Sequence, residues 1–421
     1  MPTGYKKRGG TSPLVAAIQR VPVPRTSKKQ SSTPRVLFAA TLAVTIRAFL
    51  LPIAQHFRNL GWRVDAIANG IEEDQLCQSV FDRVWDVGWT RNPVDPRNLR
   101  MARRVRDLVK EHGYDIVHVH TPVASFVTRL ALDRLRHEQN LKVVYTAHGF
   151  HFHPAGGIIR NRVFEILERK AANWTDFLVT MNREDLRAVK EKALIPLNRL
   201  RFMPGIGIDR SCYSTSSVSQ KELDHLYAEL GISAGTPVLL MLAEFVERKR
   251  HADAIRAFSK IVHPQARLVL AGTGPLLEPM RRLSAQLGVA DRLHFLGSRS
   301  DVPVLMKASR ALILPSSQEG LPRSILEALS MGVPVIGSRI RGTTDLLERN
   351  AGLLLDVGDI DGIAQAMHFV INDAAAAAAM GQAGREQSEQ YDLAHILRMH
   401  EDLYKEALEL RPAISAERTV A

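Results

Sequence analysis

Two glutamates eight positions apart, Glu319 and Glu327, mark the part of the sequence best suited to chemistry. They bracket the run Glu-Gly-Leu-Pro-Arg-Ser-Ile-Leu-Glu, which follows an apolar segment at 311–315 and opens a predicted helix at 324–329. A glycine-containing turn that leads into a helix presents backbone N–H groups and a positive dipole end to an anion. Carboxylates accept hydrogen bonds from hydroxyl groups. The run therefore suits a ligand that combines a diphosphate with hydroxyl groups, as a nucleotide-sugar does.

A cluster of cations follows a second apolar segment, 238–243. Arg248, Lys249 and Arg250 are consecutive there. Such cations can hold a diphosphate and stabilise the charge that builds on a leaving group. A solvated helix start would explain the same cluster without any ligand. Glu244 precedes the cations, and its carboxylate would repel a diphosphate unless it turns away or pairs with Arg248 or Arg250.

Histidines stand at the ends of two predicted strands, 115–120 and 143–148. His120 and His148 each end a strand, and parallel sheets bind ligands at the carboxyl ends of their strands. The alternative is that they merely cap the strands. A zinc site is disfavoured because no carboxylate or cysteine partner is evident nearby.

Apolar strands alternate with amphipathic helices in two successive sets, which predicts parallel sheets with helices on both faces. A length of 421 residues agrees with two domains. We expect an α/β protein of two Rossmann-like domains whose parallel sheets face each other across a cleft. The expected parts are a disordered basic tail at 1–34, an N-terminal domain at 35–205, a linker at 206–235, a C-terminal domain at 236–390 and a final helical segment at 391–421.

Composition and charge limit the other classes of protein. The longest apolar candidate for a membrane span, 36–54, is interrupted by Arg47 and Pro52. The first 30 residues lack the apolar core of a secretory signal. Two cysteines imply no disulfide framework and favour a reducing cytoplasm.

The net charge of +12 comes mostly from the start of the chain, where the first 64 residues hold 11 Lys and Arg but no Asp or Glu. This tail could contact an anionic membrane surface, or it could be a solvated extension. The basic stretch 100–110 allows the same two interpretations, an interfacial helix or a solvated face. No nucleic-acid motif is present, so specific nucleic-acid binding is not expected, and a non-enzymatic binder of anionic polymers is a minor alternative.

These segments together resemble the retaining GT-B glycosyltransferases of family 4, also called group 1. Besides the glutamate run, the resemblance rests on Gly272-Thr273-Gly274-Pro275, on the segment 296–302 and on Gly332-Val333-Pro334-Val335. It covers 235–360 well and 36–210 more loosely. The surroundings of His120 and His148 resemble the capsule and exopolysaccharide branch, which works on lipid-linked acceptors at the cytoplasmic face of the membrane.

The resemblance implies transfer of a hexose from a nucleotide-sugar, expected to be UDP-linked, to a lipid-linked acceptor. It implies no metal or other cofactor, and a cytoplasmic protein with a peripheral place on the inner membrane face. The segment 391–421 is expected to pack on the N-terminal domain, where the acceptor binds, while the donor binds to the C-terminal one. A nucleotide-sugar epimerase on the same fold is the alternative enzyme, and the spacing of the glutamates disfavours a glycosidase. Eight helical residues rise roughly 12 Å, beyond the about 5–9.5 Å between paired catalytic carboxylates.

The resemblance also assigns roles to individual residues. Glu319 would contact the donor sugar, Glu327 the ribose and Lys249 the diphosphate. The family's usual arginine position is Glu244 here, so Arg248 is the candidate substitute cation. The remaining candidates are His148 beside the transferred ring, the amides of Gly320 and Leu321 on the diphosphate, Arg299 near the base, and Arg47 and His120 on the acceptor side.

Overall fold

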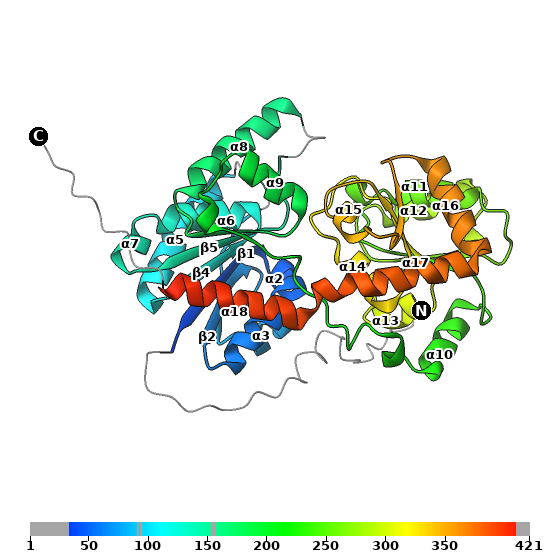
Figure 1. The fold of residues 1–421 in the computed structure, drawn as a ribbon, viewed down its shortest axis with the longest axis horizontal. Helices are drawn as coiled ribbons and strands as arrows, with labels where there is room; N and C mark the ends of the chain where they lie inside the picture. The colour runs from blue at the N-terminus through cyan, green and yellow to red at the C-terminus, as the bar shows by residue number, and fades with distance from the viewer. Residues whose placement is uncertain (1–32, 91, 93–94, 153–156, 410–421) are drawn as a thin grey trace, which may run out of the picture. The chain divides into compact units, whose positions relative to one another are not determined.

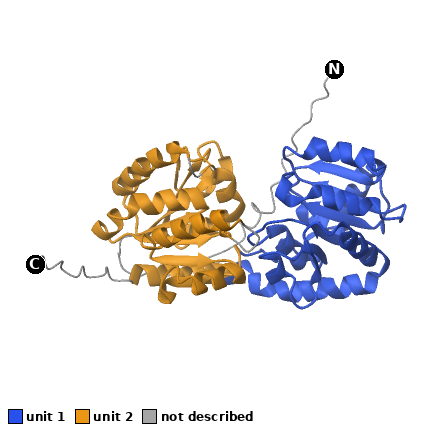
Figure 2. Ribbon diagram, turned by 90° about the horizontal axis from the view of Figure 1, so that it is seen from above, with its two compact units in different colours: residues 1–21, 207–395 blue, residues 22–206, 396–421 orange. Residues whose placement is uncertain are grey.

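The computed structural model describes residues 33–90, 92, 95–152 and 157–409, so nearly all of the expected tail, residues 1–32, lies outside it. The chain divides into two compact units (Figures 1 and 2). Unit 1 contains residues 207–395, and unit 2 contains the described residues up to 206 together with those from 396 onward.

Unit 2 is built on a parallel sheet in the order β3-β2-β1-β4-β5-β6-β7. Sequential strands lie on either side of β1, so the order reverses between β1 and β4, as in doubly wound α/β folds. The strands are β1 (Arg35–Leu42), β2 (Arg63–Asn69), β3 (Arg83–Asp86), β4 (Ile116–His120), β5 (Lys142–Ala147), β6 (Phe177–Thr180) and β7 (Leu200–Phe202).

Helices connect these strands, and the last helix of the described chain returns to the same unit from Ile396 onward. A break at Leu50, just before Pro52, separates α2 from α3, because proline cannot continue the hydrogen-bond ladder of a preceding helix. The helices are α2 (Ala43–Phe49), α3 (Leu51–Asn59), α4 (Gln75–Val80), α5 (Pro96–His112), α6 (Pro122–Leu132), α7 (Leu135–Glu138), α8 (Ile158–Ala172), α9 (Arg183–Glu191) and α18 (Leu393–Glu409), with the 3-10 turn η1 (Leu197–Arg199).

Unit 1 repeats the plan with a parallel sheet in the order β10-β9-β8-β11-β12-β13. Here the order reverses between β8 and β11. The strands are β8 (Val238–Leu242), β9 (Arg267–Ala271), β10 (Leu293–Gly297), β11 (Ala311–Leu314), β12 (Val335–Ser338) and β13 (Gly352–Leu355).

Apolar side chains of unit 1 alternate between the two faces of its sheet. Leu240 and Leu312 belong to a core with α10, α13 and α14, whereas Leu239 and Ile313 belong to a core with α11 and α16. Burial on both faces explains why these strands are continuously apolar. The helices are α10 (Gln220–Leu230), α11 (His251–Ser259), α12 (Leu277–Gln286), α13 (Val302–Lys307), α14 (Arg323–Met331), α15 (Thr343–Leu346), α16 (Ile360–Asn372) and α17 (Ala374–Gln387), with η2 (Thr215–Ser217), η3 (Glu247–Lys249), η4 (Ala290–Arg292) and η5 (Ser388–Tyr391).

The expected class, two α/β units with parallel sheets, is confirmed. Of the stretch 206–235, treated above as a linker, residues 207–235 belong to unit 1, because Tyr213, Leu223 and Leu226 are buried in its core. The segment expected to start at 391 changes unit at Ile396. In the described part of the chain, no helix has both the length and the apolar character needed to cross a membrane.

Candidate functional site

The two loops that leave the reversal point of the unit 1 sheet bring Lys249 and Glu319 together. Lys249 lies in η3, beyond the carboxyl end of β8, and Glu319 lies five residues beyond β11. The Lys249 Nζ is 2.5 Å from Glu319 Oε1, and Arg248 Nη1 is 3.6 Å from Glu319 Oε2. Ligands of open α/β sheets bind at such a reversal point, where adjacent loops diverge. This is therefore the candidate anion site of unit 1.

Close backbone packing fixes the loop that carries Lys249. Gly272 and Gly274 have φ values of +153° and +149°, and a Cβ on either would lie within 2.6 Å of the backbone of Ala243 or Phe245. Phe245 N–H donates to the Thr273 carbonyl at 2.8 Å. The glycine turn after β9 thus forms a surface that only glycine permits, against which the loop after β8 is held.

The Glu319 loop is held from two sides. The Ser317 N–H donates to the Arg248 carbonyl at 2.8 Å, which links it directly to the cation loop. Arg341, a buried residue, donates from Nε to the Glu319 carbonyl at 3.2 Å. Gly342 has a φ of +74°, and a Cβ there would lie 1.8 Å from the Gly320 carbonyl oxygen. The turn at Gly320 and Leu321 is therefore positioned by backbone contact.

Lys249 is poised by opposing effects. Burial lowers its pKa, the Glu319 carboxylate raises it, and the balance leaves the pKa below that of a free lysine. Only 13% of its side chain is exposed, whereas 45% of Arg248 is. The site thus contains one nearly buried cation and one solvated cation, both directed at the same carboxylate.

Glu244, which stands where the resemblance places an arginine, is exposed. The two cations that were its expected partners bind other carboxylates: Arg248 pairs with Glu319, and Arg250 lies 2.5 Å from Asp253. Glu244 was expected either to turn away from the cations or to pair with one of them. In the structure its side chain faces solvent.

The second glutamate lies one turn inside α14. Glu327 Oε1 accepts hydrogen bonds from the Tyr213 hydroxyl at 2.8 Å and from Arg323 Nε at 2.9 Å. Burial and the Glu327 charge raise the pKa of Tyr213, so its hydroxyl remains a donor. Helix α14 has no side-chain cap at its first turn. Its N–H groups and dipole therefore face the same loop that carries Gly320 and Leu321.

Two carboxylates hold the side chain of Arg299. Its guanidinium lies between Asp301, at 2.6 and 2.8 Å, and Glu229 of α10, at 2.5 Å. Hydrogen bonds to Asp301, and then to Glu229, raise its pKa. The structure thus gives this side chain two carboxylate partners that are not among the predicted donor contacts.

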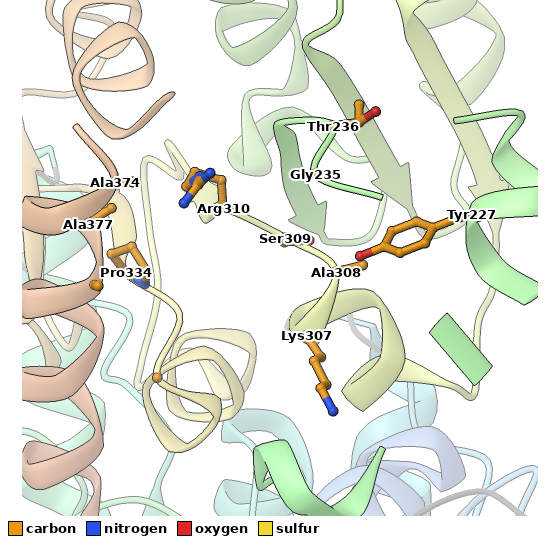
Figure 3. A pocket seen from close by; sticks show the side chains of 12 residues that line it. Tyr227, Gly235, Thr236, Lys307, Ala308, Ser309, Arg310, Pro334, Ala374 and Ala377 are labelled. Atoms are coloured by element: carbon orange, nitrogen blue, oxygen red, sulfur yellow. The ribbon is translucent and has the colours of Figure 1, made fainter. Parts of the chain in front are cut away.

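A pocket of about 250 Å³ lies elsewhere in unit 1 (Figure 3). Its lining includes Thr236, Arg310 and Pro334, which precede β8, β11 and β12. These are the amino ends of the strands, opposite to the edge that carries Lys249 and Glu319. The pocket is therefore separate from the candidate anion site.

In unit 2, two histidines predicted at strand ends contact each other. His120 Nδ1 lies 3.0 Å from His148 Nε2, and the ring of Phe49 from α2 stacks on His148 with centroids 5.5 Å apart. His120 is buried, and its Nε2 makes no hydrogen bond with the described residues. Burial lowers the pKa of His148 to about 4 and also holds the pKa of His120 well below its usual value, so both rings are neutral at neutral pH.

A strained residue follows His120 at the reversal point of the unit 2 sheet. Thr121 has a φ of +63°, which is rare for a β-branched residue. Its Oγ1 accepts from the Thr41 N–H at 2.9 Å and lies 2.8 Å from the Thr41 hydroxyl. These bonds join the ends of β1 and β4. Arg47, the other acceptor-side candidate, is about half exposed and pairs with Asp74 at 3.0 Å.

The remaining histidine on β4 has a structural setting. His118 Nδ1 lies 2.6 Å from the Tyr404 hydroxyl of α18, and Nε2 lies 2.7 Å from Thr146 Oγ1. Both ring nitrogens are thus satisfied inside unit 2. Within the described ranges, no group of three or more His, Cys, Asp or Glu side chains is placed to hold a metal ion.

Several residues of these sites were not predicted from the sequence. Arg323 could have been recognised, since it stands four residues before Glu327 in the same run and helical neighbours at that spacing interact. Tyr213 lies 114 residues before Glu327, and Phe49 lies 99 residues before His148, so no local pattern identifies them. Arg341 binds a backbone carbonyl, which leaves no trace in the sequence.

Known protein families match the two units separately. The model of the family described as Glycosyl transferases group 1 matches residues 224–387, and that of Glycosyltransferase Family 4 matches residues 48–209. EpsD of Bacillus subtilis, named as a glycosyltransferase, is 29% identical over 382 residues, or 90% of this chain and 98% of EpsD.

Two further similarities concern proteins whose names or bound molecules include a nucleotide-sugar. The UDP-Gal:alpha-D-GlcNAc-diphosphoundecaprenol alpha-1,3-galactosyltransferase of Escherichia coli is 29% identical over 290 residues, or 66% of this chain and 73% of that enzyme. The crystal structure of HepE from Anabaena in complex with UDP-glucose has a TM-score of 0.72 at 20% identity, covering 88% of this chain and 99% of HepE. At that identity, the second similarity shows the fold alone.

Proposed function

Because the chain belongs to the glycosyltransferases of group 1, also called family 4, and has their GT-B fold, we propose that it transfers a hexose from a UDP-linked donor with retention of anomeric configuration. The acceptor we propose is a lipid-linked glycan of exopolysaccharide or capsule synthesis, met at the inner face of the cytoplasmic membrane. The similarity to the E. coli galactosyltransferase, whose name includes a diphosphoundecaprenol acceptor, supports this choice. The observation that carries the proposal is the Lys249–Glu319 pair at the sheet reversal point.

Unit 1 would bind the donor. Lys249 and Arg248 hold the diphosphate together with the amides of Gly320 and Leu321, and Glu319 accepts hydrogen bonds from hexose hydroxyls. Glu327 binds the ribose hydroxyls through Oε2, since Tyr213 and Arg323 bind Oε1. Because Arg299 is held by two carboxylates, the base contact is assigned to the backbone of its loop.

In the reaction, the bond between the anomeric carbon and the diphosphate oxygen breaks, and a bond to the acceptor hydroxyl oxygen forms on the same face. The acceptor proton leaves with the departing diphosphate, whose growing charge Lys249 and Arg248 stabilise. From the family resemblance, we assign His148 a role at the transferred ring and Arg47 a role in acceptor binding. We propose that Lys249 and Arg248, with the amides of Gly320 and Leu321, stabilise the leaving group without a metal. Excess EDTA should therefore leave turnover unchanged.

A donor screen tests the proposal. Purified protein is incubated with UDP- and GDP-linked hexoses and undecaprenyl-diphosphate sugar acceptors, and nucleotide diphosphate release and glycolipid product are both measured. We expect product only with both substrates and with retained configuration by NMR. Release of a free epimerised sugar without acceptor would instead identify an epimerase, and absence of release from every donor would reject the assignment.

A further inference from the structure

Helix α8 of unit 2 turns its aliphatic side chains away from the protein. Ile158 and Ile159 are 88% and 83% exposed, and Val163 and Ile166 are 51% and 54% exposed. Ile159, Val163, Ile166 and Leu167 follow the spacing i, i+4, i+7 and i+8, so they form one continuous stripe. Single exposed apolar residues are ordinary on protein surfaces, but a contiguous apolar stripe indicates an interaction surface.

The acidic residues of α8 face the opposite way, into unit 2. Glu165 is buried and accepts from Lys192 Nζ at 2.8 Å, and Glu168 pairs with Arg129 at 3.0 Å. The usual order of a surface helix is therefore reversed in α8, with carboxylates packed inside and aliphatic side chains outside. The carboxylates are neutralised within the unit and do not repel an anionic surface.

Cations border the apolar stripe. At 100° per residue, Arg160 lies along one side of it, Arg162 and Arg169 lie along the other, and Lys170 lies at its C-terminal end. All four are exposed. Arg162 and Arg169 share the single Glu165 carboxylate with Lys192, so the surface keeps an excess of positive charge. Apolar side chains flanked by lysine and arginine are the composition of helices that lie in the interface of a bilayer.

The basic helix α5, which the sequence suggested for this role, lacks such a stripe. Its apolar residues Val105, Leu108 and Val109 are buried in the core of unit 2. Among the described residues of that helix, Leu99 is the one large apolar side chain that is exposed. Helix α5 can therefore attract a charged surface but has little apolar area to insert into it.

We infer that α8 is the membrane-docking element of this protein, lying flat on an anionic bilayer with Ile159, Val163, Ile166 and Leu167 among the acyl chains and its cations at the phosphates. This deepens the proposed function, since a lipid-linked acceptor is met at a bilayer surface. Positive charge around the stripe matches anionic headgroups, and it would repel a second copy of the same helix. A bilayer is accordingly the occupant that fits.

Vesicle co-sedimentation of the full-length chain tests the inference. The vesicles contain phosphatidylethanolamine with phosphatidylglycerol, or phosphatidylcholine alone. The test variant is the double substitution Ile159→Glu and Ile166→Glu, whose exposed positions should leave thermal stability unchanged. Leu197→Glu is the matched control, because Leu197 is 65% exposed in the same unit but lies outside α8.

We expect wild-type protein and Leu197→Glu to bind the anionic vesicles equally, and the double variant to bind at least about tenfold more weakly. Arg160→Gln and Lys170→Gln should each weaken binding about fivefold. The inference would be overturned if wild-type protein did not co-sediment with anionic vesicles, or if the double variant bound them as well as wild type does. A wild-type dimer that the double variant converts to monomer in sedimentation velocity would also overturn it, because a second copy would then cover the stripe. Lipid binding requires no donor, so a protein that binds through α8 but releases no nucleotide would refute the proposed reaction alone.

Discussion

Lys249 and Glu319 lie 70 residues apart in the chain, yet Lys249 Nζ is 2.5 Å from Glu319 Oε1. The pair forms because β8 and β11 are neighbours in the sheet, and their loops leave the same edge. The Glu319 carboxylate provides the counter-charge of this nearly buried lysine, and in the proposed function a diphosphate takes that place. We expect donor binding to exchange one anionic partner for another.

Lys249→Met should lower the turnover number about 100- to 1,000-fold, because removal of one preorganised group that stabilises the leaving charge typically costs that much. Steady-state rates of nucleotide diphosphate release measure the effect. Lys260→Met is the control, since Lys260 is an exposed lysine of the same unit that pairs with Asp361. Equal rates in Lys249→Met and wild type would exclude Lys249 from the reaction.

Glu327→Gln should raise the KM for the donor about tenfold or more, because a ribose hydroxyl would lose a charged acceptor worth about 1.5–3 kcal/mol. The amide oxygen of the introduced glutamine can still accept a hydrogen bond from Tyr213. The free energy of unfolding should therefore fall less in Glu327→Gln than in Glu327→Ala. Isothermal titration with UDP separates binding from turnover. Glu386→Gln, an exposed glutamate of the same unit, should bind UDP like wild type; unchanged UDP affinity in Glu327→Gln would reject the ribose role.

Gly342→Ala should damage both stability and donor binding. The new Cβ would meet the Gly320 carbonyl oxygen at 1.8 Å, so the turn proposed to hold the diphosphate must move. Gly288→Ala is a matched control with a φ of +67° and nothing within 4 Å of the added Cβ. It should cost only about 1 kcal/mol, from the left-handed backbone. Thermal unfolding and UDP titration of both variants measure the difference, and equal losses would mean that the contact is unimportant.

The contact between His120 and His148 predicts one tautomer. A proton on the buried His120 Nε2 would be a donor without a partner, so the proton belongs on Nδ1, which donates to His148 Nε2. His148 then carries its own proton on Nδ1. Nitrogen-15 NMR should show this form. His120→Asn, which keeps a donor near the Nδ1 position, should retain activity within a few fold, whereas His120→Leu should lose about 100-fold. A His148 protonated on Nε2 would contradict this reasoning.

Unit 2 should lose stability when the pH falls from about 6.5 to about 4. Burial lowers the pKa of His118, His120, His148 and His400, and for His148 and His400 the value is about 4. In that window the unfolded chain binds protons that the folded chain does not, so acid favours unfolding. His400 alone accounts for about 3 kcal/mol of this loss in the free energy of unfolding. The unfolding temperature should depend less steeply on pH in His400→Gln than in wild type. It should keep the wild-type dependence in His395→Gln, because His395 is an exposed histidine of the same helix. Identical slopes in all three proteins would contradict the assignment.

Much of the architecture could be read along the chain. Continuously apolar strands between amphipathic helices predicted two parallel sheets, because a strand that helices cover on both faces is apolar at every position. The end of a strand also predicts the edge at which its next residues lie, so Lys249, Glu319, His120 and His148 were all found as candidates. The sequence predicts a linker at 206–235, whereas Tyr213 and Leu223 are core residues, because the side chains that bury them come from parts of the chain far away in sequence.

The sequence by itself determined the kind of fold, the family and the residue types at the candidate anion site, because these depend on local patterns of polarity and on glycine positions. Only the tertiary structure decided which partners those residues have. It gave Glu327 its Tyr213 contact, tied Arg299 to Glu229, and paired His120 with His148. It also showed that α8, not the more basic α5, carries the exposed apolar stripe. Which face of a helix meets the core depends on what packs against it, and a periodic pattern within the helix does not contain that information.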